Sequence, residues 1–497
     1  MSGSCMRNVL QLEHRTTDSC ATLVEEIQRG PDPWNLAQRL AALPRLLFLD
    51  SAWKHSHLGR YSFIMADPFE WISSRGSRTV FSKAEVLENR SPFTVLAERI
   101  DSYHAESISG LPPFQGGAAG LFGYDLCHHL EHLPRPARDE FQVPDMAVGL
   151  YDWTIAWDHD QGRAWLISTG FPEIEPRRRR ARAAYRVRQV KKYLRDDAAK
   201  KGSRVPSQVF VTPEELAPQF AVPGIAGLSS NFSRESYLET VRKALDYIAA
   251  GDCYQVNLAQ RLLYPAVLSP VELYGRLRQH NPATFAGFFD LGDFAIASAS
   301  PERFLRVTNG AVETRPIKGT RPRGKTPRED QAQGEELLAS GKDRAENIMI
   351  VDLLRNDLGR VCRYHSVRVP AVCRLESYPF VHHLVSEVHG QLRGGVTPLD
   401  LLQAAFPGGS VTGAPKIRAM EIIAELESAA RGPYCGSLGY LGFDGTTDTN
   451  ILIRTVTAGR GWFQFPVGGG IVADSIPEHE YQETWHKARG LLRALSC

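Results

Sequence analysis

The sequence predicts an α+β fold, with strands and helices mixed along the chain. Up to about residue 168, short apolar runs alternate with Gly and Pro turns, which is typical of strands. Long helical patterns occupy residues 328–358, 414–426 and 478–495. Because strands and helices do not alternate regularly and no repeat of fixed period is visible, we prefer this class to a doubly wound parallel sheet.

A strongly basic segment divides the chain. Thirteen basic residues against two acids predict a basic helix in residues 176–204, and Ser, Pro, Gly and Ala then mark a linker that runs to Ser233. We therefore separate a strand-rich region with this helix and linker, residues 1–220, from a second region, residues 221–497. We expect the two to be interleaved in one globular unit.

The second region opens with a clear helix and strand. Ser233 suits a helix N-cap, and apolar side chains recur at helical spacing until Gly251 supplies a stop. The next segment, CYQVNLAQRLLY, changes to period two, which places Gln255 and Asn257 on a polar strand face. Five further patterns predict strands: FAGFFDLGDFAIASAS, RFLRVTNGAVETRPI, LGYLGFDG, NILIRTVTAG and WFQFPVGGGIVA.

Charge and composition are those of an ordinary soluble globular protein. The chain has 58 Lys and Arg against 56 Asp and Glu, a formal charge of +2, and is 43% hydrophobic. Bulk attraction to nucleic acid or membrane is therefore not indicated. The eight cysteines are scattered without a C-x-x-C pair, so we expect a reducing, cytoplasmic location and no zinc knuckle. No apolar stretch is long enough for a membrane span.

The basic segment offers a non-enzymatic alternative. Residues 177–204 could contact nucleic acid, but only Tyr185 and Tyr193 are interleaved as stacking aromatics. Runs of charge usually solvate a helix face, so we favour that interpretation. Salt-sensitive nucleic-acid binding would distinguish the two.

Two helical patterns place carboxylates beside apolar residues. Glu480 and Glu483 are three residues apart, hence neighbours on one helix face, with Lys487 one turn further on. Asp343 and Glu346 have the same spacing. Such carboxylates suit Mg²⁺, a hard ion that keeps coordination places for water and an anionic substrate. Ordinary surface acids have this spacing too, so spacing leaves both interpretations open.

Three further signals point to a site for anions. The glycines in residues 408–413 and 468–470 allow backbone N–H groups to approach a ligand closely. Arg454 interrupts the apolar pattern ILIRTVT, which predicts a buried or cleft-facing guanidinium that needs an anion. Lys318 and Glu302 each follow a predicted strand, where a desolvated lysine can be a nucleophile and a carboxylic acid can be a general acid. Spacing does not exclude ordinary exposed roles for either.

Eight motifs in order along the chain carry a resemblance to a known family: GDCYQVNLAQR, SPERF, TRPIKGT, KDRAEN-x-MIVDL-x-RND, FPGGSVTGAPKIRAMEII, GSLGYLGF, IRT and GGGIVADS-x-PE-x-E-x-x-ET. The series resembles the chorismate-utilising enzymes, most closely aminodeoxychorismate synthase component I, a relative of anthranilate synthase component I. PFQGGAAGLFGYDL and PDMAVGLYDW extend it over nearly the whole chain. The resemblance implies a large antiparallel β-sandwich core with surrounding helices, and a chorismate-binding catalytic region in residues 221–497.

The resemblance also assigns roles to the candidate residues. Lys318 would add to chorismate and Glu302 would protonate the departing C4 hydroxyl, after which ammonia would replace the lysine. Asp343 would lie behind the bound Mg²⁺ or contact it through water. The metal ligands would be Glu346, Glu480 and Glu483. The residues that hold the substrate would be Thr412, His383, Tyr440, Arg454, Gly469, Gly470 and Lys487.

Two positions separate close relatives within this family. The resemblance implies that Lys318 marks aminodeoxychorismate synthases, because anthranilate synthases typically carry Ala there. Gln255 stands where isochorismate-forming relatives carry a water-activating lysine, and an amide cannot act as a general base near pH 7. We therefore expect ammonia rather than water as the nucleophile. Anthranilate synthase component I, which eliminates pyruvate, is the nearest alternative.

The expected partners follow from the same resemblance. The sequence has no G-x-C-x-G nucleophile elbow, so a separate glutamine amidotransferase subunit would deliver ammonia. The chain ends soon after the carboxylate-rich helix, so we expect no fused lyase and 4-amino-4-deoxychorismate, the precursor of 4-aminobenzoate and folate, as the product. Tryptophan binding is expected at residues 49–51 and 281–285, although these depart from the feedback-sensitive pattern.

Overall fold

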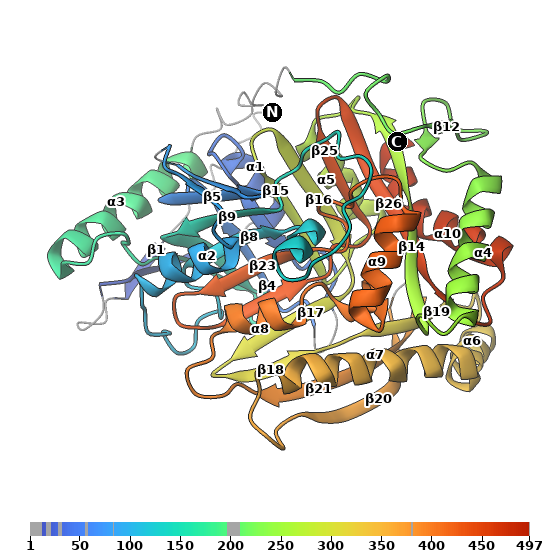
Figure 1. Cartoon of the computed structure of the whole chain (residues 1–497). Helices are drawn as coiled ribbons and strands as arrows, with labels where there is room; N and C mark the ends of the chain where they lie inside the picture. Colours follow the sequence, from blue (N-terminus) through green and yellow to red (C-terminus); the bar gives the residue numbers. More distant parts are fainter. Residues whose placement is uncertain are drawn as a thin grey trace, which may run out of the picture.

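The fold is built on two large antiparallel sheets that face each other, with helices packed on their outer faces (Figure 1). The computed structural model describes residues 12–15, 21–27, 32–54, 58–82, 84–195, 209–378 and 381–496. Both sheets draw strands from before and after residue 220, so no boundary at that residue divides the core. The predicted α+β class is confirmed.

The first sheet has fourteen strands. Its glycine-rich strand β26 lies between β25 and β14, close to the end of the order. In order across the sheet, the strands are β1 (Leu12–Arg15), β2 (Leu23–Ile27), β11 (Arg163–Ser168), β10 (Trp153–Asp158), β4 (Tyr61–Met65), β3 (Leu47–Asp50), β15 (Phe285–Asp290), β16 (Phe294–Ser300), β25 (Thr455–Gly459), β26 (Trp462–Val472), β14 (Gln255–Pro265), β13 (Ser229–Ser230) and β12 (Phe220–Ala221), with β22 (Gly413–Ala414) on β14.

The second sheet has twelve strands, and β19 lies at its edge. In order across the sheet, the strands are β19 (Ile317–Pro322), β21 (Val381–Gln391), β18 (Ala311–Thr314), β17 (Arg303–Thr308), β24 (Thr447–Asn450), β23 (Ser437–Gly442), β8 (Gly117–Phe122), β9 (Met146–Tyr151), β5 (Glu70–Arg75), β6 (Arg78–Phe81) and β7 (Val86–Glu88), with β20 (Arg368–Ser377) on β21.

Ten α-helices are described. They are α1 (Pro33–Leu40), α2 (Pro92–Asp101), α3 (Pro176–Arg195), α4 (Arg234–Ala249), α5 (Pro270–His280), α6 (Pro327–Ala339), α7 (Gly341–Gly359), α8 (Pro398–Ala405), α9 (Lys416–Leu426) and α10 (Pro477–Ser496). Two 3₁₀ turns are also described, η1 (Tyr124–His129) and η3 (Gly409–Val411). None of the described helices combines the length and the apolar character needed to cross a membrane.

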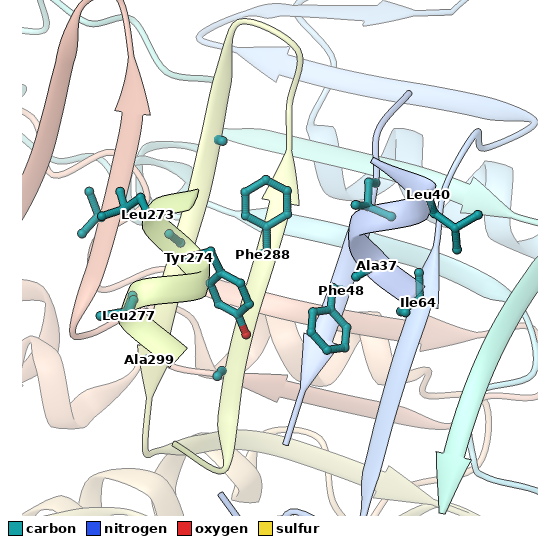
Figure 2. Packing of buried hydrophobic residues seen from close by; sticks show 14 of the residues in the cluster. Ala37, Leu40, Phe48, Ile64, Leu273, Tyr274, Leu277, Phe288 and Ala299 are labelled. Atoms are coloured by element: carbon teal, nitrogen blue, oxygen red, sulfur yellow. The ribbon is translucent and has the colours of Figure 1, made fainter. Parts of the chain in front are cut away.

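Apolar side chains fill three layers. One cluster lies between the sheets and draws on both of them, with Phe63 and Phe289 from the first and Leu121 from the second. A second cluster packs α2, α7 and α8 against the outer face of the second sheet. A third packs α1 and α5 onto β3 and β15, where Tyr274 lies between Phe48 and Phe288 (Figure 2). Burial on both faces explains why the strands carry long apolar runs.

Several predicted elements are confirmed at their ends. The Ser233 side chain accepts a hydrogen bond from Ser236 N and caps α4, and α3 covers most of the predicted basic helix. Residues 196–204 of that segment lie outside the described residues. Arg186, on the inner face of α3, is buried against Asp152 at 3.1 Å, so part of the basic helix is bound to the core.

Two elements that the sequence predicts as continuous are interrupted in the structure, one at a polar residue and one at a residue with a strained backbone. The helical pattern of residues 328–358 is two helices, because Ser340 leaves the helical conformation and caps α7 through Asp343 N. The strand predicted through ILIRTVT is also interrupted. β24 ends at Asn450 and β25 begins at Thr455, and Arg454 between them has a positive φ of 50°. Arg454 therefore lies in a bend between the two sheets rather than in a strand.

A buried ion pair joins the elements that surround the glycine-rich strand. Arg431 Nη2 lies 2.6 Å from Glu427 Oε1, and both side chains are almost completely buried. Arg431 also donates to Val411 O at 3.0 Å and to Asn257 O at 2.8 Å, and Glu427 Oε1 accepts from Ala259 N at 2.9 Å. One ion pair thus ties η3 to strand β14.

Replacing Arg431 by Met should therefore destabilise the protein severely. The change leaves the Glu427 carboxylate buried without its cation, which costs about 3–5 kcal/mol in other proteins. Urea unfolding would measure the loss. Arg242→Met is the matched control, because the Arg242–Glu239 pair on α4 is more than half exposed and should contribute less than about 1 kcal/mol. Equal small losses in the two variants would contradict the prediction.

Candidate active site

The site is built around the glycines of β26. Gly470 pairs with Asn257 and Gly469 with Leu258 across the β14 ladder. A methyl group on Gly470 would overlap the side-chain amide of Gln255 and lie 2.8 Å from Glu346 Oε1. A methyl group on Gly469 would lie 3.4 Å from Glu480 Oε2. The absence of side chains at these positions therefore leaves room between the strand and the facing helices.

The three predicted metal ligands all face this glycine strand. Glu346 comes from α7, and Glu480 and Glu483 come from the first two turns of α10. Each carboxylate is paired with a lysine, at N–O distances of 2.7, 3.5 and 2.7 Å. The pairs are Lys318–Glu346, Lys342–Glu480 and Lys487–Glu483. Burial raises the pKa of Glu480, while the Lys487 charge lowers the pKa of Glu483.

These carboxylates have the chemistry of a site for a hard cation but are turned toward lysines. Within the described part of the chain, no three acidic, histidine or cysteine side chains converge closely enough to hold a metal ion as they stand. Three carboxylates on two facing helices, against a strand without side chains, are nevertheless a donor set that Mg²⁺ accepts. A cation would have to displace the lysines from them.

Lys318 is directed by a bulge in the edge strand β19. Its register against β21 shifts between Lys318 and Thr320, and Gly319 has a φ of 81° that favours glycine. Asp343 of α7 packs over this glycine and forms an ion pair with Arg321 at 3.2 Å. The Lys318 ammonium reaches Glu346 Oε1 at 2.7 Å. The bulge thus presents the lysine to the site, and Asp343 stands behind it.

Glu302 has the environment of a general acid. It lies between β16 and β17 and is 5% exposed. Burial raises the pKa of its carboxyl to about 7, while a hydrogen bond with Ser410 and the nearby positive charge of Lys318 oppose the rise. A carboxyl with such a pKa carries its proton in a large fraction of molecules at neutral pH.

Arg454 is the site's unpaired cation. Its side chain forms no hydrogen bond or ion pair with any residue of the described ranges, and burial lowers its pKa. His383 lies close enough for burial and the Arg454 charge to lower the imidazole pKa to about 3, so this histidine is neutral. His383 Nδ1 is 2.8 Å from Thr320 Oγ1. A half-buried guanidinium with no acidic partner favours binding of an anion.

Polar groups on the β14 side also lack partners. Both side-chain polar atoms of Gln255 and the amide nitrogen of Asn257 are buried without a hydrogen bond to any described residue. Gln255 is adjacent to Gly470, and Asn257 pairs with it across the ladder. Buried amides normally have partners, so these groups point to a polar ligand or ordered water in the site.

Two predicted substrate residues are placed differently from the rest. Tyr440 is buried between the sheets, with its ring 4.7 Å from Phe114 and 5.6 Å from Phe63. It does not join the site, because alternation along β23 turns Leu438 and Tyr440 inward. Thr412 is fully buried and adjoins the site through its carbonyl, which accepts from Asn257 N, while its hydroxyl donates to Gly408 O at 3.0 Å.

Three site residues were not found from the sequence. Ser410 bonds to Glu302, Lys342 pairs with Glu480, and Ser475 Oγ donates to Glu480 Oε1 at 2.6 Å. The polar residue inside the glycine cluster GGSVTG was a usable signal for Ser410. Lys342 and Ser475 stand in the motifs KDRAEN and GGGIVADS, but their residue types do not distinguish them from ordinary polar residues near helix starts.

The two segments expected to hold tryptophan lie side by side. β3 pairs with β15, with Asp50 opposite Ala286. Asp50 is buried, and its Oδ2 accepts from Tyr274 Oη at 2.9 Å and from Arg278 Nε at 2.7 Å. Burial raises the pKa of Asp50 against the effect of Arg278. Tryptophan binding here stays a prediction.

Known proteins resemble this chain in both sequence and fold. The family model described as chorismate binding enzyme matches residues 45–493. The chain is 42% identical over 464 residues to aminodeoxychorismate synthase component 1 of Escherichia coli, covering 92% of this chain and 94% of that protein. It is 44% identical to anthranilate synthase component 1 of Thermus thermophilus, covering 83% and 84%. The crystal structure of anthranilate synthase component I from Streptococcus pneumoniae matches with a TM-score of 0.74 at 32% identity, covering 88% and 95%.

Glu302 should make the stability of the protein depend on pH. Between pH about 4.5 and 7 the native carboxyl keeps a proton that the unfolded chain has lost, so stability falls as pH rises. Glu302→Gln removes this titration. From pH 5 to 8, its free energy of unfolding should rise relative to the wild type by roughly 3 kcal/mol. Urea unfolding at both pH values measures this, and Glu335→Gln on exposed α6 should show no such trend.

Proposed function

The chain belongs to the chorismate binding enzymes, and we propose that it acts as the first component of an aminodeoxychorismate synthase. The reaction replaces the C4 hydroxyl of chorismate by an amino group and keeps the enolpyruvyl ether. The product is 4-amino-4-deoxychorismate, which leads to 4-aminobenzoate and folate.

The placement of Lys318 is the observation that carries this proposal. Overall similarity does not select the reaction, since relatives named for both activities are 42–44% identical to the chain. The resemblance implies that residue 318 separates the two branches, and the Lys318 ammonium lies 2.7 Å from Glu346, beside the glycine strand. Its positive charge also acts on Glu302. A potential nucleophile and a potential acid therefore share one site.

Positive groups in the site suit a substrate with two carboxylates. Arg454 is a cation without an acidic partner in the described chain, and Lys487 is held beside β26 by Gly468 O at 2.8 Å. Gly469 and Gly470 carry no side chains of their own, so their backbone can come close to a ligand that lies among the Gln255, Glu346 and Glu480 side chains. We assign one carboxylate to the Arg454 side and the other to the glycine strand with Lys487.

The carboxylates opposite the glycines are the proposed Mg²⁺ ligands. Glu346, Glu480 and Glu483 would hold the ion, which when bound supplies positive charge to the ring carboxylate and draws electron density from the ring. Asp343 is engaged with Arg321 behind this set and orients the start of α7. Lys318 would leave Glu346 when the ion binds.

The chain's own residues perform two displacements. Once the Lys318 ammonium has released a proton to solvent water, its amine adds at C2, the ring double bonds shift, and the C4 hydroxyl leaves as water with the proton of Glu302. Ammonia then adds at C4, the double bond shifts back, and the C2–lysine bond breaks. The proton released by the ammonium formed at C4 restores Glu302. His383, neutral because of burial and Arg454, contributes only hydrogen bonding near the ring.

Product analysis tests the proposal directly. The purified chain is incubated with chorismate, Mg²⁺ and an ammonium salt, the product is identified by mass spectrometry, and released pyruvate is assayed. We expect an aminated product that retains its pyruvyl ether. Anthranilate with stoichiometric pyruvate would instead assign the chain to the other branch, and binding of nucleic acid without turnover would favour the non-enzymatic alternative.

Lys318→Ala should strongly reduce this amination, because the first displacement loses its nucleophile. Glu302→Gln should reduce it by about 10² to 10⁴. Lys325→Ala is the control, since this lysine is exposed in the turn that follows β19. An undiminished rate in the Lys318 variant would remove its covalent role.

Metal dependence should follow the same carboxylates. A chelator should abolish turnover, and Mg²⁺ should restore it. Glu483→Gln removes one anionic ligand and should weaken binding of Mn²⁺, followed by electron paramagnetic resonance, by at least about tenfold. Glu478→Gln on the same helix is the matched control, because Glu478 pairs with Arg234 and not with the site. Equal Mn²⁺ binding in all three proteins would place the metal elsewhere.

A further inference from the structure

Asn257 is a polar residue buried in the wall of the active site. Its side chain is 5% exposed, and its amide nitrogen forms no hydrogen bond with any described residue. A buried donor without a partner is costly, because it has given up its hydrogen bonds to water and gained none in exchange. A polar group of a ligand in the site would supply the missing acceptor.

The backbone of Asn257 is fixed on both of its polar groups. The N–H donates to Thr412 O at 2.7 Å, and the carbonyl accepts from Arg431 Nη2 at 2.8 Å. Both partners belong to one buried frame, because Arg431 also donates to Val411 O. The chain thus presents the unused amide from a fixed position, which reduces the ordering that a ligand has to impose when it binds.

Alternation along β14 directs the Asn257 side chain into the site. Val256 and Leu258 pack in the apolar cluster formed with α4 and α9, so Asn257 between them faces the other side of the strand. Gln255 faces that side too, and a methyl group on Gly470 would overlap its amide. Asn257 pairs with the same glycine, on the neighbouring strand β26 (Figure 1). Both amides therefore emerge over the active site.

Asn257 stands on the side of the site that holds the general acid. Two residues further along the same face of β14, Ala259 belongs to the buried cluster that contains Val411. Val411 follows Ser410, which hydrogen-bonds to Glu302. The unused amide of Asn257 thus lies between the glycine strand and the turn that contacts Glu302.

We propose that the Asn257 amide donates a hydrogen bond to the oxygen at C4 of chorismate, beside the proton that Glu302 delivers. In its role during the reaction this contact rests on the proposed function, because it requires the C4 hydroxyl as the leaving group. A hydroxyl oxygen has two lone pairs, so it can accept from both groups together. When the C4–O bond breaks, its electron pair stays on the oxygen, Glu302 gives its proton, and the amide stabilises the negative charge that develops until water has formed.

The C4 oxygen is the acceptor that the other groups of the site leave without a donor. The two carboxylates of the substrate are assigned to the Arg454 side and to the glycine strand with Lys487, where the Gln255 amide also stands. A neutral amide suits the position beside Glu302 better than a further cation. An additional positive charge there would favour loss of the proton that Glu302 has to deliver.

A pair of ligands that differ only at C4 tests this contact. The ligands are 4-hydroxybenzoate carrying an enolpyruvyl ether at C3, and the same compound without its hydroxyl. Isothermal titration calorimetry with Mg²⁺ gives their dissociation constants for the wild type, Asn257→Leu and Gln260→Met. Gln260 is the matched control, because it is also a buried amide of β14. Its two polar atoms are paired on the opposite strand face, with Thr484 Oγ1 and Ser230 Oγ at 2.7 Å each.

The wild type should bind the hydroxylated ligand at least about fivefold more tightly than the other, because the ligand without the hydroxyl leaves the buried donor unpaired. Asn257→Leu should bind the two ligands within about twofold of each other, and Gln260→Met should keep the wild-type preference. An unchanged preference in the Asn257 variant, or no preference in the wild type, would overturn the proposal.

Stability separates this role from a structural one. Asn257→Leu removes an unpaired buried donor, so its midpoint of urea unfolding should equal or exceed that of the wild type, whereas Gln260→Met should unfold at lower urea because it breaks two hydrogen bonds. Amination by Asn257→Leu with ammonium salt should nevertheless fall at least about tenfold.

A lower unfolding midpoint of Asn257→Leu, with equal loss of affinity for both ligands, would make Asn257 a part of the framework and overturn the proposal. Failure of the proposed function is a separate result. A wild type that prefers the hydroxylated ligand but does not aminate chorismate would disprove the amination while the contact at C4 stands.

Discussion

The active site depends on the buried ion pair between Arg431 and Glu427. The Arg431 guanidinium donates to the carbonyls of Val411 and Asn257, and the Glu427 carboxylate accepts from Ala259 N. The Val411 carbonyl belongs to the turn that presents Ser410 to Glu302, while the Asn257 carbonyl and the Ala259 N–H belong to β14, the strand that pairs with the glycine strand β26. Desolvation of a buried ion pair is costly. We therefore assign this pair the role of holding η3 at a fixed distance from β14, rather than a large net contribution to the free energy of unfolding.

Charge balance inside the site follows from this rigid frame. Three lysines neutralise three carboxylates in the site, while the Arg454 guanidinium forms no ion pair with any described residue. Arg454 lies in a bend with positive φ, so its backbone is not part of a regular strand. The proposed substrate with two carboxylates, accompanied by the proposed divalent cation, would neutralise both Arg454 and the lysines that the cation would displace.

Sequence patterns located most elements but not the contacts between them. Period-two runs and the Ser233 cap were sufficient for β14 and α4, and the spacing of Glu480 and Glu483 placed them on one face of α10. The order of strands was not accessible, because pairs such as β14 with β26 join segments that lie far apart in the sequence. For the same reason the Ser410–Glu302 contact was missed. Tyr440 lies in the core between the sheets, which a motif could not indicate because it does not reveal which strand face is turned to the core.

The position of Lys318 on an edge strand explains how one fold can serve several reactions. Among the described strands β19 pairs with β21 alone, so a bulge at Gly319 can aim the preceding side chain at the site without disturbing a second ladder. A change at residue 318 would therefore alter the proposed nucleophile while the two sheets, the glycine strand and the carboxylates stay in place. Similar overall identity to relatives named for different reactions is the expected result of such an arrangement. Because a few side chains around a common frame decide the reaction type, Lys318 carries more weight than overall similarity.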